Sequence, residues 1–290
     1  MSLISPYEHA HKQQFRGNLH THSTLTDGIY SMQEVIDLYG DRNFDFLMLS
    51  DHDTLSDPAD YDDRGMILFP GNEITAQGGH LLHVNAKELI QPDPDRQVVL
   101  DAIERSGGFA IINHPNWGCR FSHWPQKELE RLQGYRGIEI YNGVTERAEG
   151  EAQATDRWDM LLTQGRKIWG YGNDDFHILC DLERVWNMVF AESRSAEALL
   201  ESLERGNFYV STGLRLDTIT VCGNRVSISA PEVECYRIIG DWGAIFATVE
   251  GPELSFEADP ELPFSYFRIE CFGKGTEKAW TQPFWLQAPH

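Results

Sequence analysis

The most restrictive feature of this sequence is the alternation, from about residue 15 to residue 190, of short apolar runs with segments of helical pattern. This alternation is typical of βα units arranged around a parallel sheet. At 290 residues the chain is long enough for a large barrel with a buried core. The predicted strands span 17–22, 46–50, 66–70, 81–85, 109–112, 138–141, 168–171 and 187–190, and the predicted helices span 31–40, 95–106, 126–133, 148–164 and 196–205.

The pattern changes after about residue 213. Short alternating runs at 218–221, 226–229, 236–239, 245–249 and 267–272 are separated by Gly, Pro and Asp. Strands of this kind favour an antiparallel sheet with one solvated face. We therefore predict an α/β barrel in residues 1–212 and a small antiparallel β-domain or extension in residues 213–290.

Residues capable of binding metal ions follow most of the predicted strands. His20 and His22 are two residues apart, so a strand over 17–22 would place both rings on one face. The full set is His20, His22, Asp27, His52, Glu73, His80 or His83, His114, Asp175 and His177. Most of these residues lie at the carboxyl end of a strand, where parallel barrels build active sites. His80 and His83 are the exception, because they lie at the start of a predicted strand or inside it.

The chemistry of this set indicates a site for more than one ion. It contains imidazole and carboxylate donors and no cysteine, which suits Zn²⁺, Mn²⁺ or Fe²⁺. At four to six bonds per ion, nine protein ligands would serve about two or three ions.

Charge and cysteine content restrict the partners and the compartment. Lys and Arg total 24 against 45 for Asp and Glu, giving a net charge of −21. A chain this acidic disfavours large nucleic acids and anionic membranes as partners. Five widely spaced cysteines without a CxxC pair predict reduced thiols and a cytoplasmic location. No apolar stretch reaches the roughly 18 residues of a membrane helix, and the first 14 residues lack a signal-peptide core.

Six segments, taken in order, resemble the PHP family, named after its polymerase and histidinol-phosphatase members. The matching segments are His20-Thr21-His22 with Asp27-Gly28, Ser50-Asp51-His52-Asp53, Gly71-Asn72-Glu73-Ile74, Gly79-His80-Leu81-Leu82, Asn113-His114-Pro115 and Gly172-Asn173-Asp174-Asp175-Phe176-His177. The resemblance implies a distorted, TIM-like (βα)7 barrel that holds two or three divalent metals and hydrolyses phosphoesters.

The resemblance also implies a role for each of these residues. One metal would be held by His20, His22, Glu73 and Asp175. Glu73 would bridge to a second metal, completed by His80 and His114, and a third would be held by Asp27, His52 and His177. Glu73, Asp175 and His177 would be catalytic. This sequence has His83 where the family pattern has a small residue, so we favour His80 as the ligand.

Other residues are assigned on their own chemistry. Asp51 and Asp174 are candidates for holding imidazole tautomers, and His177, His83 or a bound water for protonating the leaving group. Arg120, Arg147 and Arg184 would clamp the phosphate of a small phosphomonoester or short nucleotide, or else lie on the surface. We interpret Trp117 as packing, and His9, His11, His123 and His290 as ordinary histidines outside the site.

Two other functions are compatible with part of this pattern. Amidohydrolase-type enzymes also begin with an HxH pair, but they bridge two metals with a strand lysine. Residues 70–140 offer only Lys87 and Lys127, neither at a predicted strand end. A binding or regulatory protein with a vestigial metal site is the other alternative, although no ligand of the set is missing.

Overall fold

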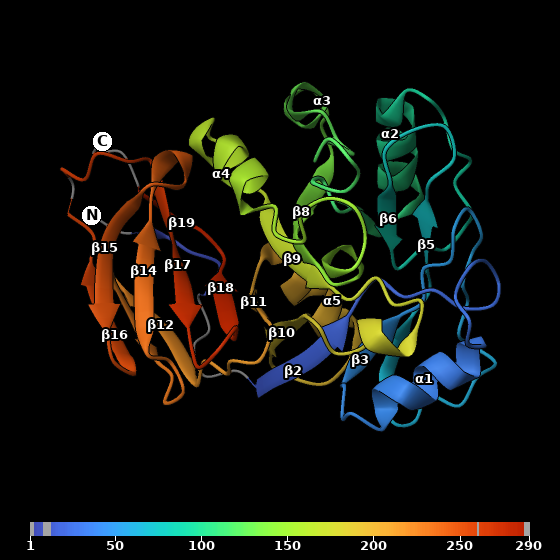
Figure 1. The fold of residues 1–290 in the computed structure, drawn as a ribbon, viewed down its shortest axis with the longest axis horizontal. Coiled ribbons are helices and arrows are strands. Elements are labelled where there is room, and N and C mark those ends of the chain that lie inside the picture. Colours follow the sequence, from blue (N-terminus) through green and yellow to red (C-terminus); the bar gives the residue numbers. More distant parts are fainter. Residues whose placement is uncertain (1–2, 8–12, 260, 287–290) are drawn as a thin grey trace.

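The computed structural model describes residues 3–7, 13–259 and 261–286 and shows an α/β fold with many strands and few helices (Figure 1). The N-terminal three quarters carries the helices, whereas the C-terminal strands, coloured orange to red, form the end of the molecule opposite α1. The helices are α1 (Met32–Gly40), α2 (Arg96–Ser106), α3 (Gln126–Arg131), α4 (Thr155–Thr163) and α5 (Ala196–Arg205).

A five-stranded sheet forms one side of the part of the chain that carries the predicted ligands. In spatial order its strands are β5 (Gly71–Ile74), β6 (Leu81–Val84), β7 (Phe109–Ile112), β8 (Tyr135–Asn142) and β9 (Trp169–Asn173). Strands β7, β8 and β9 are parallel, but β6 is antiparallel to both β5 and β7. The start of β6 therefore lies at the same edge as the carboxyl end of β7. The sequence does not predict strand β5. Its pairing with the reversed strand β6 explains why His80 and His83 lie at the start of a predicted strand or inside it.

An eleven-stranded sheet forms the other side and continues into the C-terminal region. Strands β2 (Gln13–Asn18), β3 (Phe46–Met48) and β4 (Ile67–Phe69) are parallel, and β10 (Trp186–Ala191) lies antiparallel to both β2 and β11 (Phe208–Ser211). The rest of this sheet is β18 (Lys278–Thr281), β17 (Tyr266–Phe272), β19 (Phe284–Leu286), β1 (Leu3–Ile4), β14 (Cys235–Ile239) and β15 (Ile245–Glu250). All these additional pairings are antiparallel.

A third, antiparallel sheet lies in the C-terminal region and consists of β12 (Thr218–Cys222), β13 (Arg225–Ser229) and β16 (Glu253–Glu257). The strands predicted after residue 213 are thus present, with β16, β18 and β19 in addition. Because β11 pairs with β18, the main sheet crosses the predicted boundary at residue 212. The boundary itself stays a prediction.

The strands do not close into a barrel within the described residues, so the predicted TIM-like barrel is not found. Between the two larger sheets the backbone pairs through isolated bridges, Thr21 with Phe176, His52 with Glu73 and Ser56 with Gly71. On the other side, the amide of Asn187 in β10 makes hydrogen bonds to the backbone of Gly172 in β9. The antiparallel strands β6 and β10 interrupt the parallel repeat that a regular (βα)7 barrel requires. As a further correction, His20 and His22 follow β2 instead of lying within a strand.

The helices begin and end where local chemistry satisfies their backbones. Ser31 caps α1 in a capping box with Glu34, and Asp95 caps α2. Helix α5 ends at Gly206, whose φ of 78° is a left-handed conformation that favours glycine. Helix α4 begins at Thr155, seven residues later than predicted, because residues 148–154 form bends and two isolated bridges, Gly150 with Trp117 and Gln153 with Tyr141.

Apolar side chains fill the space between sheets and helices, and a second apolar cluster fills the C-terminal region. A buried ion pair joins the two parts: Arg268 of β17 donates from Nε and Nη2 to Asp159 of α4, at 2.7 and 2.8 Å. All five cysteines are free thiols. No helix in the described part of the chain has the length and apolar character needed to cross a membrane.

Candidate metal centre

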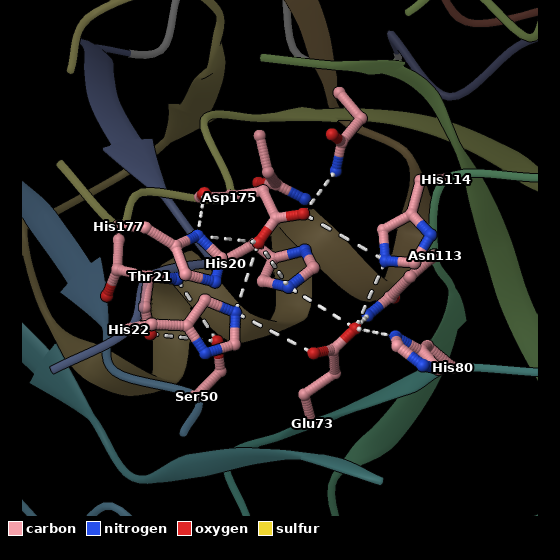
Figure 2. A network of polar contacts seen from close by, with 12 residues as sticks. His20, Thr21, His22, Ser50, Glu73, His80, Asn113, His114, Asp175 and His177 are labelled. Carbon is pink, nitrogen blue, oxygen red and sulfur yellow. Dashed lines mark hydrogen bonds and ion pairs between the residues drawn. The ribbon is translucent and has the colours of Figure 1, made fainter. Parts of the chain in front are cut away.

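Nine side chains predicted as metal ligands converge at one edge of the sheets, and Figure 2 labels all of them except Asp27 and His52. Each has a donor atom within 4 Å of a donor atom of another member, and the set comprises His20, His22, Asp27, His52, Glu73, His80, His114, Asp175 and His177. The structure therefore brings together residues from six separate segments. Their role as ligands stays a prediction, and their arrangement can be compared with that role.

The backbone around His20 and His22 is held by hydrogen bonds from both sides. The N–H of His22 donates to the carbonyl of Phe176 at 2.8 Å, and the N–H of Ser50 donates to the carbonyl of Thr21 at 2.9 Å. This extended segment directs His20 and His22 to the same side, as a period of two predicts. Both imidazoles are fully buried.

The carboxylate of Glu73 contacts several members of the cluster, as the dashed lines in Figure 2 show. Its Oε1 is 3.1 Å from His80 Nδ1 and 3.2 Å from His114 Nε2, and its Oε2 is 2.7 Å from His52 Nδ1. Asn113 Nδ2 donates to Oε1 at 2.7 Å. A buried carboxylate with histidines beside both oxygens has the arrangement expected of a bridging ligand.

Asp175 lies next to the rings of both His20 and His22. Its Oδ1 lies 3.2 Å from His20 Nε2 and 3.1 Å from His22 Nε2. Its φ of 53° is left-handed, which is uncommon for a residue with a side chain. The backbone carbonyl of Asp175 is 2.7 Å from His177 Nδ1, which leaves Nε2 of that ring free to face Asp27.

Asp27 is the most exposed of the carboxylates and completes a third group. Its Oδ2 lies 3.3 Å from His52 Nε2 and 3.4 Å from His177 Nε2. Although partial burial opposes ionisation, hydrogen bonds from these two rings lower the pKa of Asp27. Burial likewise opposes protonation of His52, but the carboxylates of Asp27 and Glu73 raise the pKa of His52 to about 10.

The donor set fits divalent cations. Within the described residues, four groups of histidines and carboxylates have donor atoms close enough to share an ion, and they are His22/Asp27/His52/His177, His80/His114/His123, His20/His22/Glu73 and His20/His114/Asp175. Several buried donor atoms, including Nε2 of His20, Nε2 of His22 and Oε2 of Glu73, lie close to oppositely charged groups but make no hydrogen bond within the described residues. Buried polar atoms are almost always satisfied, so these atoms indicate positions for bound cations.

The structure separates His80 from His83. His80 precedes β6 and faces Glu73, whereas His83 lies within β6 with its Nε2 2.8 Å from the carbonyl of Gly107. His83 does not line the cavity of the site. This position favours His80 as the ligand, and it excludes direct proton donation by His83 to a substrate in this cavity.

His123, interpreted from the sequence as outside the site, packs against it. Its ring centroid lies 4.4 Å from that of His80 and 4.9 Å from that of His114. The N–H of His80 donates to His123 Nε2 at 2.9 Å, and burial together with the neighbouring rings lowers the pKa of His123 to about 2. A residue nine positions after His114 in a loop carries no sequence signal for this contact. His9, His11 and His290 lie outside the described residues.

Asp51 and Asp174 accept hydrogen bonds from groups other than the predicted imidazoles. Asp51 accepts hydrogen bonds from Ser23, Thr26 and Ser56, and Asp174 accepts them from the hydroxyl of Tyr39 and three backbone N–H groups at residues 183–185. Both carboxylates therefore hold loops of the site. The imidazole partner is Glu139 of β8, whose Oε1 lies 2.8 Å from His20 Nδ1. The sequence signal for Glu139 is that it is an acidic residue inside the apolar run 138–141.

A cavity of about 220 Å³ opens onto the cluster. Besides seven of the nine side chains it is lined by Trp117, Val144, Thr145, Arg147 and Ala148. Asp181 accepts two hydrogen bonds from Arg147, at 2.5 and 2.8 Å, and raises the pKa of that guanidinium. Arg184 instead pairs with Glu146 outside this cavity, and Arg120 does not line it. Of the three predicted arginines, Arg147 alone faces the site.

Several solved structures match this chain at low sequence identity. A two-domain protein from Bacteroides vulgatus, containing a predicted PHP-like metal-dependent phosphoesterase, matches with a TM-score of 0.54 and 17% identity over 100% of this chain and 91% of that chain. PsfC from Pseudomonas syringae matches with a TM-score of 0.48 and 13% identity over 66% of this chain and 88% of that one. An amidohydrolase from Chromobacterium violaceum matches with a TM-score of 0.42 and 16% identity over 56% and 87%.

The first of these similarities includes the C-terminal strands, because it extends over the whole chain. It confirms, at the level of the fold, the resemblance to PHP-like proteins that the six sequence segments predict. No protein-family model and no curated protein matches the sequence.

Proposed function

We propose that this chain is a metal-dependent phosphoesterase that hydrolyses a small phosphomonoester or a short nucleotide. The observation that carries the proposal is the convergence of six histidines and three carboxylates around one cavity, with buried imidazole nitrogens that make no hydrogen bond within the described residues. The fold shared with a PHP-like phosphoesterase supports it.

Three parts of the cluster would hold the cations. His20, His22 and Asp175 would bind one ion, Glu73 would bridge it to a second at His80 and His114, and a third would lie between Asp27, His52 and His177. When bound, these Zn²⁺, Mn²⁺ or Fe²⁺ ions would offset the charge of the phosphate oxygens and lower the pKa of an attacking water. An acidic chain can thereby present a positive pocket to a small phosphorylated substrate.

Arg147 would orient the phosphate. Asp181 engages Nε and Nη2 of Arg147 and also accepts the backbone N–H of His177, so the guanidinium is tied to the loop that carries a predicted ligand. Within the described part of the chain, Nη1 has no hydrogen-bond partner and is free for a phosphate oxygen. A planar guanidinium held on one edge is well suited to such binding.

The cavity also limits which side chain can protonate the leaving group and how large the substrate can be. Of the two side chains considered as proton donors, His177 lines the cavity and His83 does not. Trp117, Val144 and Ala148 give the cavity an apolar wall next to the metal cluster. A volume of about 220 Å³ accommodates a phosphate group with a small organic portion, in agreement with a small substrate.

The proposal is tested with the purified chain and two generic substrates, 4-nitrophenyl phosphate and adenosine monophosphate. We expect at least two divalent ions per chain by elemental analysis, and phosphate release that is lost on chelation and restored by metal. Asp175→Ala or His20→Ala should each reduce the rate by at least about 100-fold, the upper end of what loss of a ligand's partner alone costs. The exposed Asp60→Ala variant is the matched control.

Two outcomes would replace the proposal. Hydrolysis of amides or lactones without phosphate release would favour the amidohydrolase-type alternative, although neither Lys87 nor Lys127 lines the cavity. A folded chain that binds phosphate esters equally well after metal removal, and does not hydrolyse them, would favour a binding protein with a vestigial site.

A further inference from the structure

Glu139 is a fully buried carboxylate in the middle of β8, and it makes four hydrogen bonds to the metal cluster and its neighbours. Its Oε1 lies 2.8 Å from His20 Nδ1 and accepts from Asn173 Nδ2 at 2.9 Å. Its Oε2 accepts from the backbone N–H of His114 and from Asn142 Nδ2, both at 2.9 Å. Each carboxylate oxygen thus has two partners.

The surroundings of Glu139 fix the direction of these hydrogen bonds. The amide oxygen of Asn142 accepts from Thr145, and that of Asn173 accepts from the N–H of Leu19, so both amide nitrogens must point to Glu139. With the N–H of His114, three of the four partners are donors. The remaining partner, His20 Nδ1, therefore donates as well, since an ionised carboxylate only accepts.

This donation determines which nitrogen of His20 faces the cluster. A proton on Nδ1 leaves Nε2 without one in the neutral ring, and Nε2 lies 3.2 Å from Asp175 Oδ1 and 3.4 Å from Glu73 Oε1. Metal-binding histidines commonly donate their other ring N–H to a carboxylate, which fixes the tautomer and raises the basicity of the ligand.

Glu139 also reaches two other predicted ligands. His114 has a φ of 27°, an uncommon conformation for a residue with a side chain, and its N–H is held by Glu139 Oε2. The amide nitrogen of Asn142 donates both to Glu139 Oε2 and to Asp175 Oδ2, the latter at 3.1 Å. One buried side chain therefore connects ligands that belong to two different proposed metal positions.

We infer that Glu139 is a positioning residue that sets the tautomer of His20 and holds His20, His114 and Asp175 as one preorganised unit for metal binding. The inference rests on the proposed function, because it concerns the same metal cluster. It assigns Glu139 no contact with the substrate.

The test compares Glu139→Gln with the unmodified chain. Because each oxygen of Glu139 faces two donors, the NH₂ group of the glutamine meets two donors in either orientation. We expect the affinity of the metal-free chain for Zn²⁺, measured by competition with a chelator, to fall about 10- to 100-fold. Glu139→Asp keeps the charge and should recover part of that loss.

The matched control is Asp159→Asn, which alters a buried carboxylate that accepts hydrogen bonds from Arg268 and Tyr266 away from the cluster. We expect it to lower stability and leave the Zn²⁺ affinity unchanged. Equal Zn²⁺ affinity of Glu139→Gln and the unmodified chain would overturn the inference, as would an equal loss in Asp159→Asn. Loss of affinity in Glu139→Gln with no phosphate release from any chain would uphold the inference and refute the proposed phosphoesterase.

A measurement on the unmodified chain keeps the inference testable if Glu139→Gln does not fold. In the Zn²⁺-loaded protein, the ¹⁵N-histidine spectrum should show His20 protonated at Nδ1, with a proton that is protected from solvent exchange. Assignment uses the signal missing from His20→Ala. A Nδ1 without a proton, or a rapidly exchanging one, would contradict the role of Glu139.

Discussion

Replacing His80 and His83 tests the assignment of the metal ligands, because the two residues are three positions apart and only His80 faces the cluster. His80 Nδ1 lies 3.1 Å from Glu73 Oε1 at the edge of the cavity. His83 lies in β6 with no exposed surface, and its Nε2 is 2.8 Å from the carbonyl of Gly107. Replacing each by alanine should therefore change two different properties of the protein.

The expected magnitudes follow from these surroundings. His83→Ala removes one buried hydrogen bond and leaves a space the size of an imidazole ring, so the free energy of unfolding should fall by about 2–4 kcal/mol. His80→Ala removes a partly exposed ring, and in the metal-free chain it should cost about 1 kcal/mol. Its main effect should be on metal binding, because it deletes one predicted ligand of the second ion.

Two assays separate the variants. Urea unfolding of the chelated chains gives the stability, and elemental analysis after dialysis against metal gives the ion content. We expect His83→Ala to keep the full metal content with reduced stability, and His80→Ala to lose one ion or bind it weakly. A His83→Ala chain that lost an ion, or a His80→Ala chain with unchanged content, would refute the assignment.

Three other perturbations have defined outcomes. Arg147→Met should raise KM for a phosphate ester about 10- to 100-fold, since a charged hydrogen bond contributes about 1.5–3 kcal/mol, with a smaller change in kcat; steady-state kinetics check this. Neighbouring carboxylates raise the pKa of His52 to about 10. The ion pairs of protonated His52 therefore stabilise the metal-free chain fully below about pH 6.5, and this stabilisation is lost as the pH rises through about 10. Apparent Zn²⁺ affinity should rise over the same interval, with proton release at neutral pH detectable by calorimetry in buffers of different ionisation heat. Arg268→Met should cost about 3–5 kcal/mol in urea unfolding by leaving Asp159 buried without its cation, and adding Asp159→Leu should recover most of it.

The sequence was most informative where a residue acts through its type and spacing. Imidazoles and carboxylates that recur after apolar runs predict His20, His22, Glu73, His114 and Asp175 as ligands, and the structure brings these side chains together. The apolar runs themselves predicted most of the strands, including β7 with the bounds that the structure has.

Direction and closure of the sheet could not be predicted in the same way. Strand β5 is the polar tetrapeptide Gly71–Ile74, which has neither an apolar run nor a clear alternation. Without it, the hairpin that reverses β6 is not visible in the sequence, and a parallel barrel is the simplest interpretation. The partners of a strand depend on contacts between distant segments, and short strands specify these contacts weakly.

The positioning residues were missed for a related reason. The sequence favours Asp51 and Asp174 because they adjoin predicted ligands, yet both accept hydrogen bonds from loops. Glu139 adjoins no ligand along the chain and reaches His20 across the space between two sheets. Proximity in sequence is a poor guide to such contacts, since β8 and the segment after β2 come together only in the folded chain.

The eleven-stranded sheet has a consequence for dividing the protein. A chain cut at residue 212 would lose β18, so that the N–H and C=O groups of β11 that now pair with it would form an open edge able to recruit other molecules. It would also lose Gln282, whose amide both donates to and accepts from the backbone of Gly170 in β9. Residues 1–212 therefore do not end at a natural edge of the sheet, and producing them alone would require a redesigned edge with charged or proline residues along β11.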